Sequence, residues 1–389
     1  MPWKVINQMD TKTEFVLRVM RQDSDFRALC REFGISRKTG YKWKERFLRD
    51  GMSGLHDRSR RPESSPNQLD EDQVCRIVRL KQAHPHWGPR KIREVFARQF
   101  SAELVPSEST FKRVLNKAGL VDHRRERKSQ EAGTRLTQPI AAERPNHVWT
   151  VDFKGWWYTL DRHRFEPLTI RDDYSRYVLC ARALSSARTE VVREEFNRVF
   201  TRNGLPEIIR SDNGAPFAAV SSPLGLTRLS AWWLTLGIDL DRIRPGKPQE
   251  NGAHERMHRD MAHELESAAE ADLVKQQASL DVWVNAFNNE RPHESLGMKV
   301  PRDMYAVSSR RFDPTPVQLV YPSHYHVRKV KTSGCISIKN VDILISQALS
   351  GLHVGLEPIV DNRYTMWFCR LPLGELDLTT ASFRKTVGV

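Results

Sequence analysis

The sequence predicts a multidomain α/β protein with a helical N-terminal part, a central α/β domain and a small all-β C-terminal domain. Residues 1–130 contain short amphipathic stretches that begin with capping residues, which is typical of small helices. Between residues 146 and 308, stretches of strand and helix character alternate, as in layered α/β domains. Residues 317–389 alternate apolar and polar positions in the manner of strands, which predicts a small all-β module that closes as a barrel. We expect domains at 1–62, 68–130, 140–310 and 317–389.

The first domain is predicted to be a helix-turn-helix. Thr11 and Glu14 fit a capping box at the start of one helix, and Asp23 is placed to cap a second. Gly34 lies in the turn, and Ser36 is placed to cap a third helix that runs to Arg49. We therefore expect three short helices, the last of which can serve as a recognition helix.

The third helix has two different faces. Trp43 and Phe47 are four residues apart and are expected to face the core. The opposite side carries Arg37, Lys38, Tyr41 and Lys42. An apolar back and a basic front suit insertion into the major groove of DNA, whereas the alternative is a solvated surface helix.

Residues 51–69 have the composition of a linker, with glycine, proline and serine. Arg58, Arg60 and Arg61 lie in it, and they can follow the DNA backbone or enter a minor groove. The alternative is a soluble tether.

Residues 70–120 predict a second helix-turn-helix. Pro89 suits the first turn of its middle helix, Ser107 is placed to cap its last helix, and Gly119 to end that helix. Its candidate DNA contacts are Arg90, Lys91, Lys112 and Arg113. His84 and His86 lack partner cysteines at zinc spacing, so we expect no metal there.

The central part alternates strands and helices. The predicted strands are 148–153, 166–169, 177–183 and 207–211, and the predicted helices are 186–203, 229–236, 250–269 and 280–287.

The charge of the chain is positive and unevenly distributed. The net charge is +14, and residues 1–130 hold 29 Lys and Arg against 17 Asp and Glu, a net of +12. Such concentration indicates a nucleic-acid-binding region. The five widely spaced cysteines argue against a disulfide framework, and no apolar run is long enough to span a membrane. We expect a cytoplasmic, nucleoid-associated protein.

Three carboxylates are the candidate catalytic and metal-ligating residues. Asp152 and Asp212 follow predicted strands, and Glu255 lies on a predicted helix. Carboxylates are preferred ligands of Mg²⁺, and two divalent ions can activate an oxygen nucleophile and neutralise the leaving oxygen of a phosphodiester. Asn251 and Arg259 lie one turn before and after Glu255, where Asn251 can orient it and Arg259 can contact phosphate.

Other acidic residues compete for the same role. Asp172 and Asp173 also follow an apolar strand, but their setting before Tyr174 favours a hairpin turn. Asp239 and Asp241 are interpreted as loop acids.

These blocks carry a resemblance. Trp149–Phe153, Ser211–Gly214 and Pro248–Arg256 resemble the three catalytic blocks of retroviral-type integrases and bacterial insertion-sequence transposases, and Asn289–Tyr305 resembles the end of the same domain. Phe33–Trp43 and Trp87–Lys91 resemble the N-terminal modules of the IS481 and IS3 transposase group. The resemblance covers nearly the whole chain, and the joint motif set is specific.

The resemblance implies an RNase H-like core, two Mg²⁺ or Mn²⁺ ions held by Asp152, Asp212 and Glu255, and an SH3-like module at the C-terminus. It also implies a homo-oligomer on double-stranded DNA that pairs element ends and joins them to target DNA without a covalent enzyme intermediate.

The chain departs from the family in two ways. Helix-turn-helix units replace the retroviral zinc module, and 42 residues separate Asp212 from Glu255, an excess that we place in Ala218–Leu229. Glu250 would shorten the gap to 37 residues but does not match the motif position.

Three functions are compatible with these features. The first is a transposase that cuts and joins DNA with an Asp-Asp-Glu triad. The second is a DNA-binding regulator derived from a transposase that lacks strand transfer, which an intact triad disfavours. The third is a nuclease, which the two DNA-binding modules disfavour.

Overall fold

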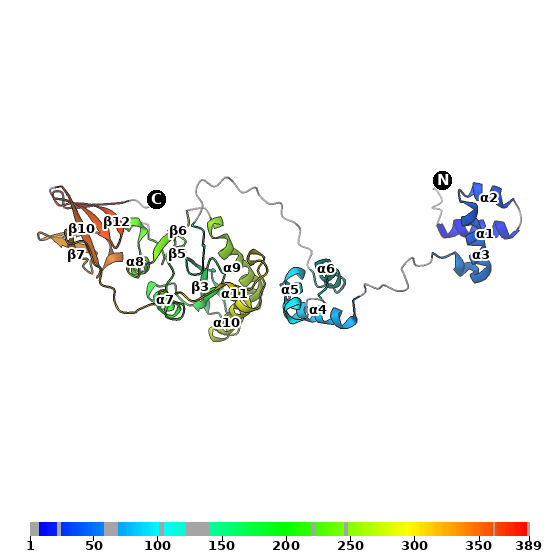
Figure 1. The fold of residues 1–389 in the computed structure, drawn as a ribbon, viewed down its shortest axis with the longest axis horizontal. Coiled ribbons are helices and arrows are strands. Elements are labelled where there is room, and N and C mark those ends of the chain that lie inside the picture. The colour runs from blue at the N-terminus through cyan, green and yellow to red at the C-terminus, as the bar shows by residue number, and fades with distance from the viewer. Residues whose placement is uncertain are drawn as a thin grey trace. The chain divides into compact units, whose positions relative to one another are not determined.

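The structure is a computed structural model that describes residues 8–21, 25–57, 69–100, 105–121, 140–219, 222–244, 248–360 and 362–386. The chain divides into two compact units, Met1–Asp70 and Glu71–Val389 (Figure 1). The helix-turn-helix, α/β and all-β parts expected from the sequence are all present.

The first unit is a three-helix bundle. It contains α1 (Gln8–Arg21), α2 (Phe26–Glu32) and α3 (Arg37–Asp50). Its buried core is made by Phe15, Val16, Leu29, Cys30, Trp43 and Leu55. The helix-turn-helix prediction is confirmed, and Phe47 packs against this core as expected.

Two of the predicted caps in this unit are wrong. Helix α1 already includes Gln8, so Thr11 lies inside it and cannot begin it. Asp23 lies outside the described residues, and α2 is capped instead by Asp25, whose side chain accepts a hydrogen bond from the Ala28 amide. Ser36 caps α3 as predicted, accepting from the Thr39 amide at 3.1 Å.

The turn and the helix crossing depend on glycines. Gly34 has φ +64°, a conformation that favours glycine, in the turn before α3. A side chain at Gly40 would place its Cβ 2.8 Å from Cys30 Sγ, so this residue lets α2 and α3 pack closely. The predicted linker also starts later than expected. Gly51–Leu55 forms a 3-10 helix whose Leu55 is fully buried in the bundle.

The second unit begins with another three-helix module, α4 (Glu71–Ala83), α5 (Pro89–Gln99) and α6 (Glu108–Lys117). Pro89 lies in the first turn of α5 and Ser107 at the N-cap of α6, as predicted. The turn before α5 is fixed by the buried Lys81, whose ammonium donates to the carbonyls of Pro85 and Trp87. The ring of His84 stacks on that of Trp87 at 3.8 Å between centroids, so His84 has a packing role.

The α/β domain is built on a mixed sheet. Its strands are β1 (Val148–Phe153), β2 (Trp157–Tyr158), β3 (Arg164–Asp172), β4 (Val178–Leu184), β5 (Ile208–Ser211) and β6 (Asp239–Arg242). The order is β2-β3-β1-β5-β6, with β4 also paired to β3. Strands β1, β3 and β4 pair antiparallel, whereas β5 and β6 continue the sheet parallel to β1. The RNase H-like mixed sheet expected from the resemblance is thus present.

Helices cover both faces of this sheet. The helices are α7 (Thr189–Asn203), α8 (Arg228–Thr235), α9 (Gly252–Leu265), α10 (Leu273–Asn289) and α11 (Pro301–Met304). One apolar core joins Val151 and Ile170 of the sheet to Phe196 of α7 and Trp233 of α8. A second core joins Phe165 and Val178 to Met257 of α9 and Trp283 of α10. The period of two along β1 and β3 explains this, because neighbouring residues face opposite layers.

Several boundaries differ from those predicted. Strand β3 runs from Arg164 to Asp172 rather than from 166 to 169, and α10 starts seven residues earlier than expected. Helix α7 starts at Thr189 and α9 ends at Leu265. Asp239 and Asp241, which the sequence placed in a loop, lie on strand β6. Strand β3 and helix α10 are longer than predicted because packing in three dimensions extends them through polar residues, whereas α7 and α9 are shorter than predicted.

The C-terminal domain is all β, as predicted. Its strands are β7 (His326–Lys329), β8 (Cys335–Ile338), β9 (Val341–Leu344), β10 (His353–Val360), β11 (Arg363–Phe368), β12 (Leu371–Asp377) and β13 (Ser382–Lys385). They form an antiparallel five-stranded sheet and the β8-β9 hairpin. A core that includes Ile336 of the hairpin and Met366 of the sheet lies between them.

This C-terminal core is shared with the α/β domain. Leu226, Ala231 and Leu234 are buried in it, and they come from α8 and the segment before it. Ser222 Oγ lies 2.7 Å from Ser346 Oγ across the same contact. The residues expected to lengthen the gap between Asp212 and Glu255 therefore contact the C-terminal domain.

All five cysteines are free thiols. Within the described parts of the chain, none of the helices has the length and apolar character needed to cross a membrane.

Candidate functional site

Asp152 and Asp212 lie at the ends of neighbouring parallel strands. The register of β1 and β5 pairs Val148 with Ile208 and Thr150 with Arg210. Continuing this register by two residues places Asp152 opposite Asp212. Since parallel strands end at the same edge of a sheet, the two carboxylates are brought to one edge.

The loop after Asp212 is shaped around its side chain. The carboxylate accepts a hydrogen bond from the Gly214 amide at 3.2 Å, and Asn213 Nδ2 donates to the Ile243 carbonyl. A Cβ at Gly214 would lie 2.9 Å from Asp212 Oδ2, so a larger residue there would displace the carboxylate. The Asp-Asn-Gly order thus has a local structural reason in this chain.

Glu255 lies in the first turn of α9 and is half-buried. The helix is held against the sheet by His254, Met257, His258 and Met261, which are all buried. The competing Glu250 accepts hydrogen bonds from the backbone amide and the Nε of Arg244 at 3.0 and 2.7 Å. Its carboxylate is therefore engaged in an ion pair with a neighbouring loop.

The three carboxylates act on each other electrostatically. Burial, together with the charges of Asp212 and then Glu255, raises the pKa of Asp152 to about 7, against a hydrogen bond from the Phe153 amide that lowers it. Mutual repulsion of this kind favours a cation or a proton between carboxylates. Within the described residues, however, no three His, Cys, Asp or Glu side chains form a group able to hold a metal ion in this arrangement.

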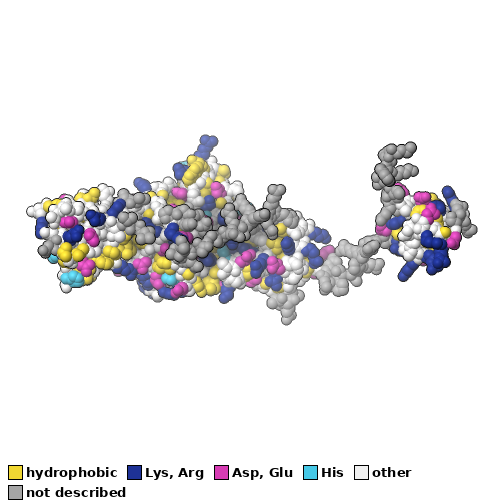
Figure 2. All heavy atoms as spheres, turned by 90° about the horizontal axis from the view of Figure 1, so that it is seen from above, with side chains coloured by type: hydrophobic (Ala, Val, Ile, Leu, Met, Phe, Trp, Pro, Cys, Tyr) yellow, Lys and Arg dark blue, Asp and Glu magenta, His cyan; other side chains and the backbone are white. Residues whose placement is uncertain are grey.

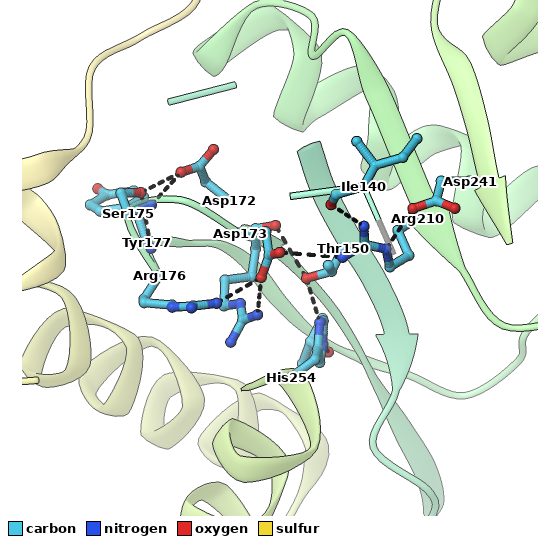
Figure 3. Close-up of polar contacts among 12 residues, drawn as sticks. Ile140, Thr150, Asp172, Asp173, Ser175, Arg176, Tyr177, Arg210, Asp241 and His254 are labelled. Atoms are coloured by element: carbon cyan, nitrogen blue, oxygen red, sulfur yellow. Dashed lines mark hydrogen bonds and ion pairs between the residues drawn. The ribbon is translucent and has the colours of Figure 1, made fainter. Parts of the chain in front are cut away.

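Two histidines of α9 lie directly behind Asp152. Nε2 of His254 and Nε2 of His258 each lie 2.7 Å from Thr169 Oγ1, and His254 Nδ1 lies 2.7 Å from Thr150 Oγ1. Thr169 in turn donates to the Asp152 carbonyl at 2.9 Å. Figure 3 shows His254 pointing from its helix at Thr150 on the strand. This network joins α9 to β1 and β3 beside the candidate site.

The competing residues Asp172 and Asp173 have structural partners. Asp172 is fully buried and accepts hydrogen bonds from the Asn146 amide and from the amide and hydroxyl of Ser175, which fix the β3–β4 hairpin. Asp173 pairs with Arg171, Arg176 and Arg210 (Figure 3). The hairpin-turn interpretation is confirmed. Asp241 pairs with Arg210, and Asp239 with Arg370.

The residues flanking Glu255 have different positions. Asn251 is buried at the N-cap of α9, and its Oδ1 has no hydrogen-bond partner among the residues that the structure describes. Arg259 is exposed on the same helix. Sequence reasoning missed Arg242, a largely buried arginine of β6 whose pKa is lowered by burial and raised by the charge of Asp212. It also missed His254 and His258, although their four-residue spacing places both on one helix face.

The candidate DNA contacts of the first unit form one surface. Arg37, Lys38, Tyr41 and Lys42 are all exposed on α3, opposite the buried Trp43. Figure 2 shows Lys and Arg side chains gathered on part of this helical unit. Arg58, Arg60 and Arg61 lie outside the described residues.

The candidate contacts of the second module divide into two groups. Lys112 and Arg113 are exposed on α6. Arg90 lies 4.0 Å from Glu108 and 3.9 Å from Glu294, and Lys91 is half-buried near Arg291 and Asp260. The two residues of α5 therefore face acidic side chains.

Family profiles match successive parts of the chain. A helix-turn-helix domain matches residues 11–63, and a homeodomain-like domain matches residues 39–115. Integrase core domain profiles match residues 142–248 and 236–301. The C-terminal domain of IS481 family transposases matches residues 325–384.

Similar proteins come from bacterial insertion elements and retroviruses. The chain is 24% identical over 245 residues to an uncharacterized 31.7 kDa protein of insertion element IS407 from Burkholderia multivorans, covering 63% of this chain and 84% of that protein. It is 24% identical over 260 residues to an uncharacterized 39.2 kDa protein of insertion element IS476 from Xanthomonas euvesicatoria, covering 67% and 71%.

Two viral structures were also found. The HTLV-2 integrase catalytic core domain in complex with magnesium has a TM-score of 0.34 at 15% identity, covering 43% of this chain and 100% of that chain. The simian T-cell lymphotropic virus intasome in complex with a PP2A regulatory subunit has a TM-score of 0.37 at 13% identity, covering 76% and 97%.

Proposed function

We propose that this chain, which belongs with the insertion-sequence transposases, binds the ends of its own mobile element and cuts and joins DNA there. The proposal is supported by its helix-turn-helix domains, its integrase core domain and the C-terminal domain of IS481 family transposases. Asp152, Asp212 and Glu255 are the proposed catalytic residues. The observation that carries this assignment is the β1–β5 register, which sets Asp152 opposite Asp212 at one sheet edge while Glu255 acts on Asp152 from α9.

The donor set fits divalent cations. Asp152, Asp212 and Glu255 offer carboxylate oxygens, the ligands that Mg²⁺ and Mn²⁺ prefer, and the raised pKa of Asp152 reflects negative charge that a cation would relieve. We propose that these three side chains hold two such ions. Bound there, the ions would supply charge neutralisation on a phosphodiester and a more acidic water or hydroxyl.

The protein contributes position and environment. Asp152 and Asp212 are fixed by strands, and rigid strands hold a site more accurately than loops do. Glu255 is fixed by a helix whose histidines are hydrogen-bonded to Thr150 and Thr169. The helix-turn-helix units would place element ends of double-stranded DNA at this edge, with Arg37, Lys38 and Lys42 contacting bases or phosphates. Joining two ends requires more than one copy of the chain, so we propose a homo-oligomer on DNA.

The test is strand transfer. Purified full-length protein is incubated with Mg²⁺ or Mn²⁺, labelled duplexes of the gene's own flanking ends and a target plasmid. We expect joined product from the native protein and none from Asp152→Asn, Asp212→Asn or Glu255→Gln, each with DNA binding retained. Glu250→Gln is the matched control, because Glu250 lies two residues before α9 and is the competing candidate for the third ligand.

The outcomes separate the possible functions. Joining that survives in all three carboxylate variants would overturn the proposed triad. Joining lost in Glu250→Gln and kept in Glu255→Gln would reassign the third ligand. Specific binding to the ends without joining in either metal would favour a DNA-binding regulator, and cleaved ends that are never joined would favour a nuclease.

A further inference from the structure

A hollow of about 470 Å³ lies beside α9, in the second compact unit. Cationic side chains dominate its lining, and they are Lys91, Arg171, Arg176, Arg256, Arg259 and Arg291. Asp260 and Glu294 are its only acidic lining residues among the residues described. Positive charges that face one hollow repel each other, so an arrangement of this kind favours an anionic ligand.

Two of these arginines are buried and incompletely hydrogen-bonded. Arg171 and Arg291 are 2% and 4% exposed. Arg291 pairs with Asp260 at 2.7 Å and Glu264 at 3.1 Å, and Arg171 pairs with Asp173 at 2.8 Å. Yet the Nε of each guanidinium has no hydrogen-bond partner within the described parts of the chain. Because buried N–H donors without acceptors are rare, both guanidinium groups keep hydrogen-bonding capacity that their ion pairs do not use.

The neighbouring acids do not balance the positive charge. The single carboxylate of Asp173 lies within 3.3 Å of nitrogen atoms of three arginines, Arg171, Arg176 and Arg210. Arg256 and Arg259 are exposed, and neither forms an ion pair with any described residue. Burial lowers the pKa of Lys91 to about 8, with the charge of Arg291 acting in the same direction. The charges of Asp260, Glu294 and Glu264 act in the opposite direction.

We propose that this hollow binds phosphate groups of the DNA backbone next to the catalytic carboxylates. The inference rests on the proposed function, which it deepens by locating a second DNA contact outside the helix-turn-helix units. Glu255 and Arg256 are consecutive on α9, so their side chains point in directions about 100° apart. One helix therefore supplies the Glu255 carboxylate to the proposed catalytic site and the Arg256 guanidinium to the hollow.

The chemistry of the lining suits phosphodiesters. Guanidinium groups bind phosphate oxygens with two parallel hydrogen bonds, and they are less strongly hydrated than ammonium groups. The buried pair is fixed in place by Asp260, Glu264 and Asp173, so little side-chain entropy is lost on binding. The exposed pair on α9 can follow the backbone as it leaves the hollow. Phosphate contacts of this kind fix the register of DNA without reading its sequence.

The experiment measures how DNA affinity depends on salt. Fluorescence anisotropy gives the Kd of full-length protein for a duplex of the element end between about 50 and 200 mM KCl, without divalent metal. The variants are Arg256→Gln and the double variant Arg256→Gln/Arg259→Gln, both on the exposed face of α9. Arg202→Gln is the matched control, because Arg202 is an exposed arginine on α7 that does not line the hollow.

We expect the slope of log K against log salt to fall by about 0.9 in the single variant and by about 1.8 in the double variant. The control should keep the native slope. An unchanged slope in both α9 variants, with native affinity, would overturn the proposal. Displacement of the DNA by millimolar inorganic phosphate at constant ionic strength, with an unchanged slope in the variants, would show a site for free phosphate instead and would also overturn it.

The result is separable from that of strand transfer. Binding is measured without metal, so a native protein that binds DNA but never joins it still reports on the hollow. Conversely, if the protein joins DNA but the salt dependence of its DNA affinity does not change in the Arg256 and Arg259 variants, phosphate binding in the hollow is refuted. The catalytic assignment is then unaffected.

Discussion

Nδ1 of His258 lies 3.8 Å from Oδ2 of Asp152, and Nε2 of the same ring lies 2.7 Å from Thr169 Oγ1. The Thr169 hydroxyl has one hydrogen, which it donates to the Asp152 carbonyl. Its oxygen must therefore accept from the Nε2–H groups of both His254 and His258. The Nδ1 lone pair of His258 consequently faces the Asp152 carboxylate. Burial lowers the pKa of His258 to about 3, with Lys154 and Arg171 acting in the same direction, so the ring is neutral at pH 7.

His258 positions Asp152 through Thr169, because its Nε2–H group holds the hydroxyl that donates to the Asp152 carbonyl. The variant His258→Leu keeps most of the bulk and removes both nitrogens. Because residues that support metal ligands typically contribute 10–100-fold to affinity, we expect Mn²⁺ binding to weaken about tenfold. Isothermal titration calorimetry measures it, with His263→Leu, an exposed histidine of the same helix, as control. Equal affinities in the two variants would show that His258 only packs.

His254 is expected to matter for stability more than for chemistry. It is completely buried and bridges Thr150 and Thr169, so His254→Ala leaves a cavity and two threonine hydroxyls with fewer partners. We expect a loss of about 3 kcal/mol in the free energy of unfolding. Urea denaturation followed by tryptophan fluorescence measures it. The exposed His263→Ala should change stability by less than about 0.5 kcal/mol, and a similar small effect at His254 would contradict the network.

The raised pKa of Asp152 predicts a pH-dependent stability. A carboxyl whose pKa rises from 3.8 to about 7 on folding stabilises the native state below pH 3.8, and this contribution is lost as the pH rises through 7. The full difference corresponds to roughly 4 kcal/mol at about 1.4 kcal/mol per pKa unit. Asn cannot ionise, so Asp152→Asn should raise the melting temperature in EDTA, and more at pH 8.5 than at pH 5.5.

Differential scanning fluorimetry checks this, with Asp281→Asn on the exposed face of α10 as control. Addition of Mg²⁺ should stabilise the native protein and not the Asp152→Asn variant, because the cation offsets the repulsion that the substitution removes. A gain that is independent of pH would mean that Asp152 is not the residue that resists ionisation.

The exposed face of α3 predicts a contribution to DNA binding. If Lys42 contacts phosphate, Lys42→Gln weakens binding equally for specific and unrelated duplexes and lowers the salt slope by about one. Anisotropy titrations against both duplexes measure it. Lys275→Gln, on the exposed surface of α10, is the control. A native slope would remove Lys42 from the phosphate contacts.

The sequence predicted those features that depend on neighbouring residues. The cap at Ser36, the proline at the start of α5 and the strands before Asp152 and Asp212 follow from local patterns, and all are present. The prediction from sequence was wrong for the N-cap of α2, where two nearby aspartates were both suitable by residue type. Asp23 and Asp25 are both of a residue type that caps helices, and Asp25 is the one that caps α2.

Long-range polar partners could not be predicted from the sequence. His254 meets Thr150 and Thr169 across 104 and 85 residues, and no period links a helix histidine to a strand threonine. Arg171 was likewise hidden, because an arginine within an apolar strand gives no sign of whether it points to solvent or into a buried ion pair. The proposed triad was predicted from its motifs and strand ends, whereas the residues packed around it could be named only from the fold.

The shared core between α8 and the C-terminal sheet changes how the chain can be divided. Leu226, Ala231 and Leu234 would be exposed to solvent if the chain ended before residue 317. A catalytic fragment that ended there would therefore have a new hydrophobic surface patch. Fragments of this protein should therefore aggregate when the last domain is removed and stay monodisperse when it is kept. Modules that exchange freely between proteins join through polar linkers, and here the junction is itself part of a hydrophobic interior.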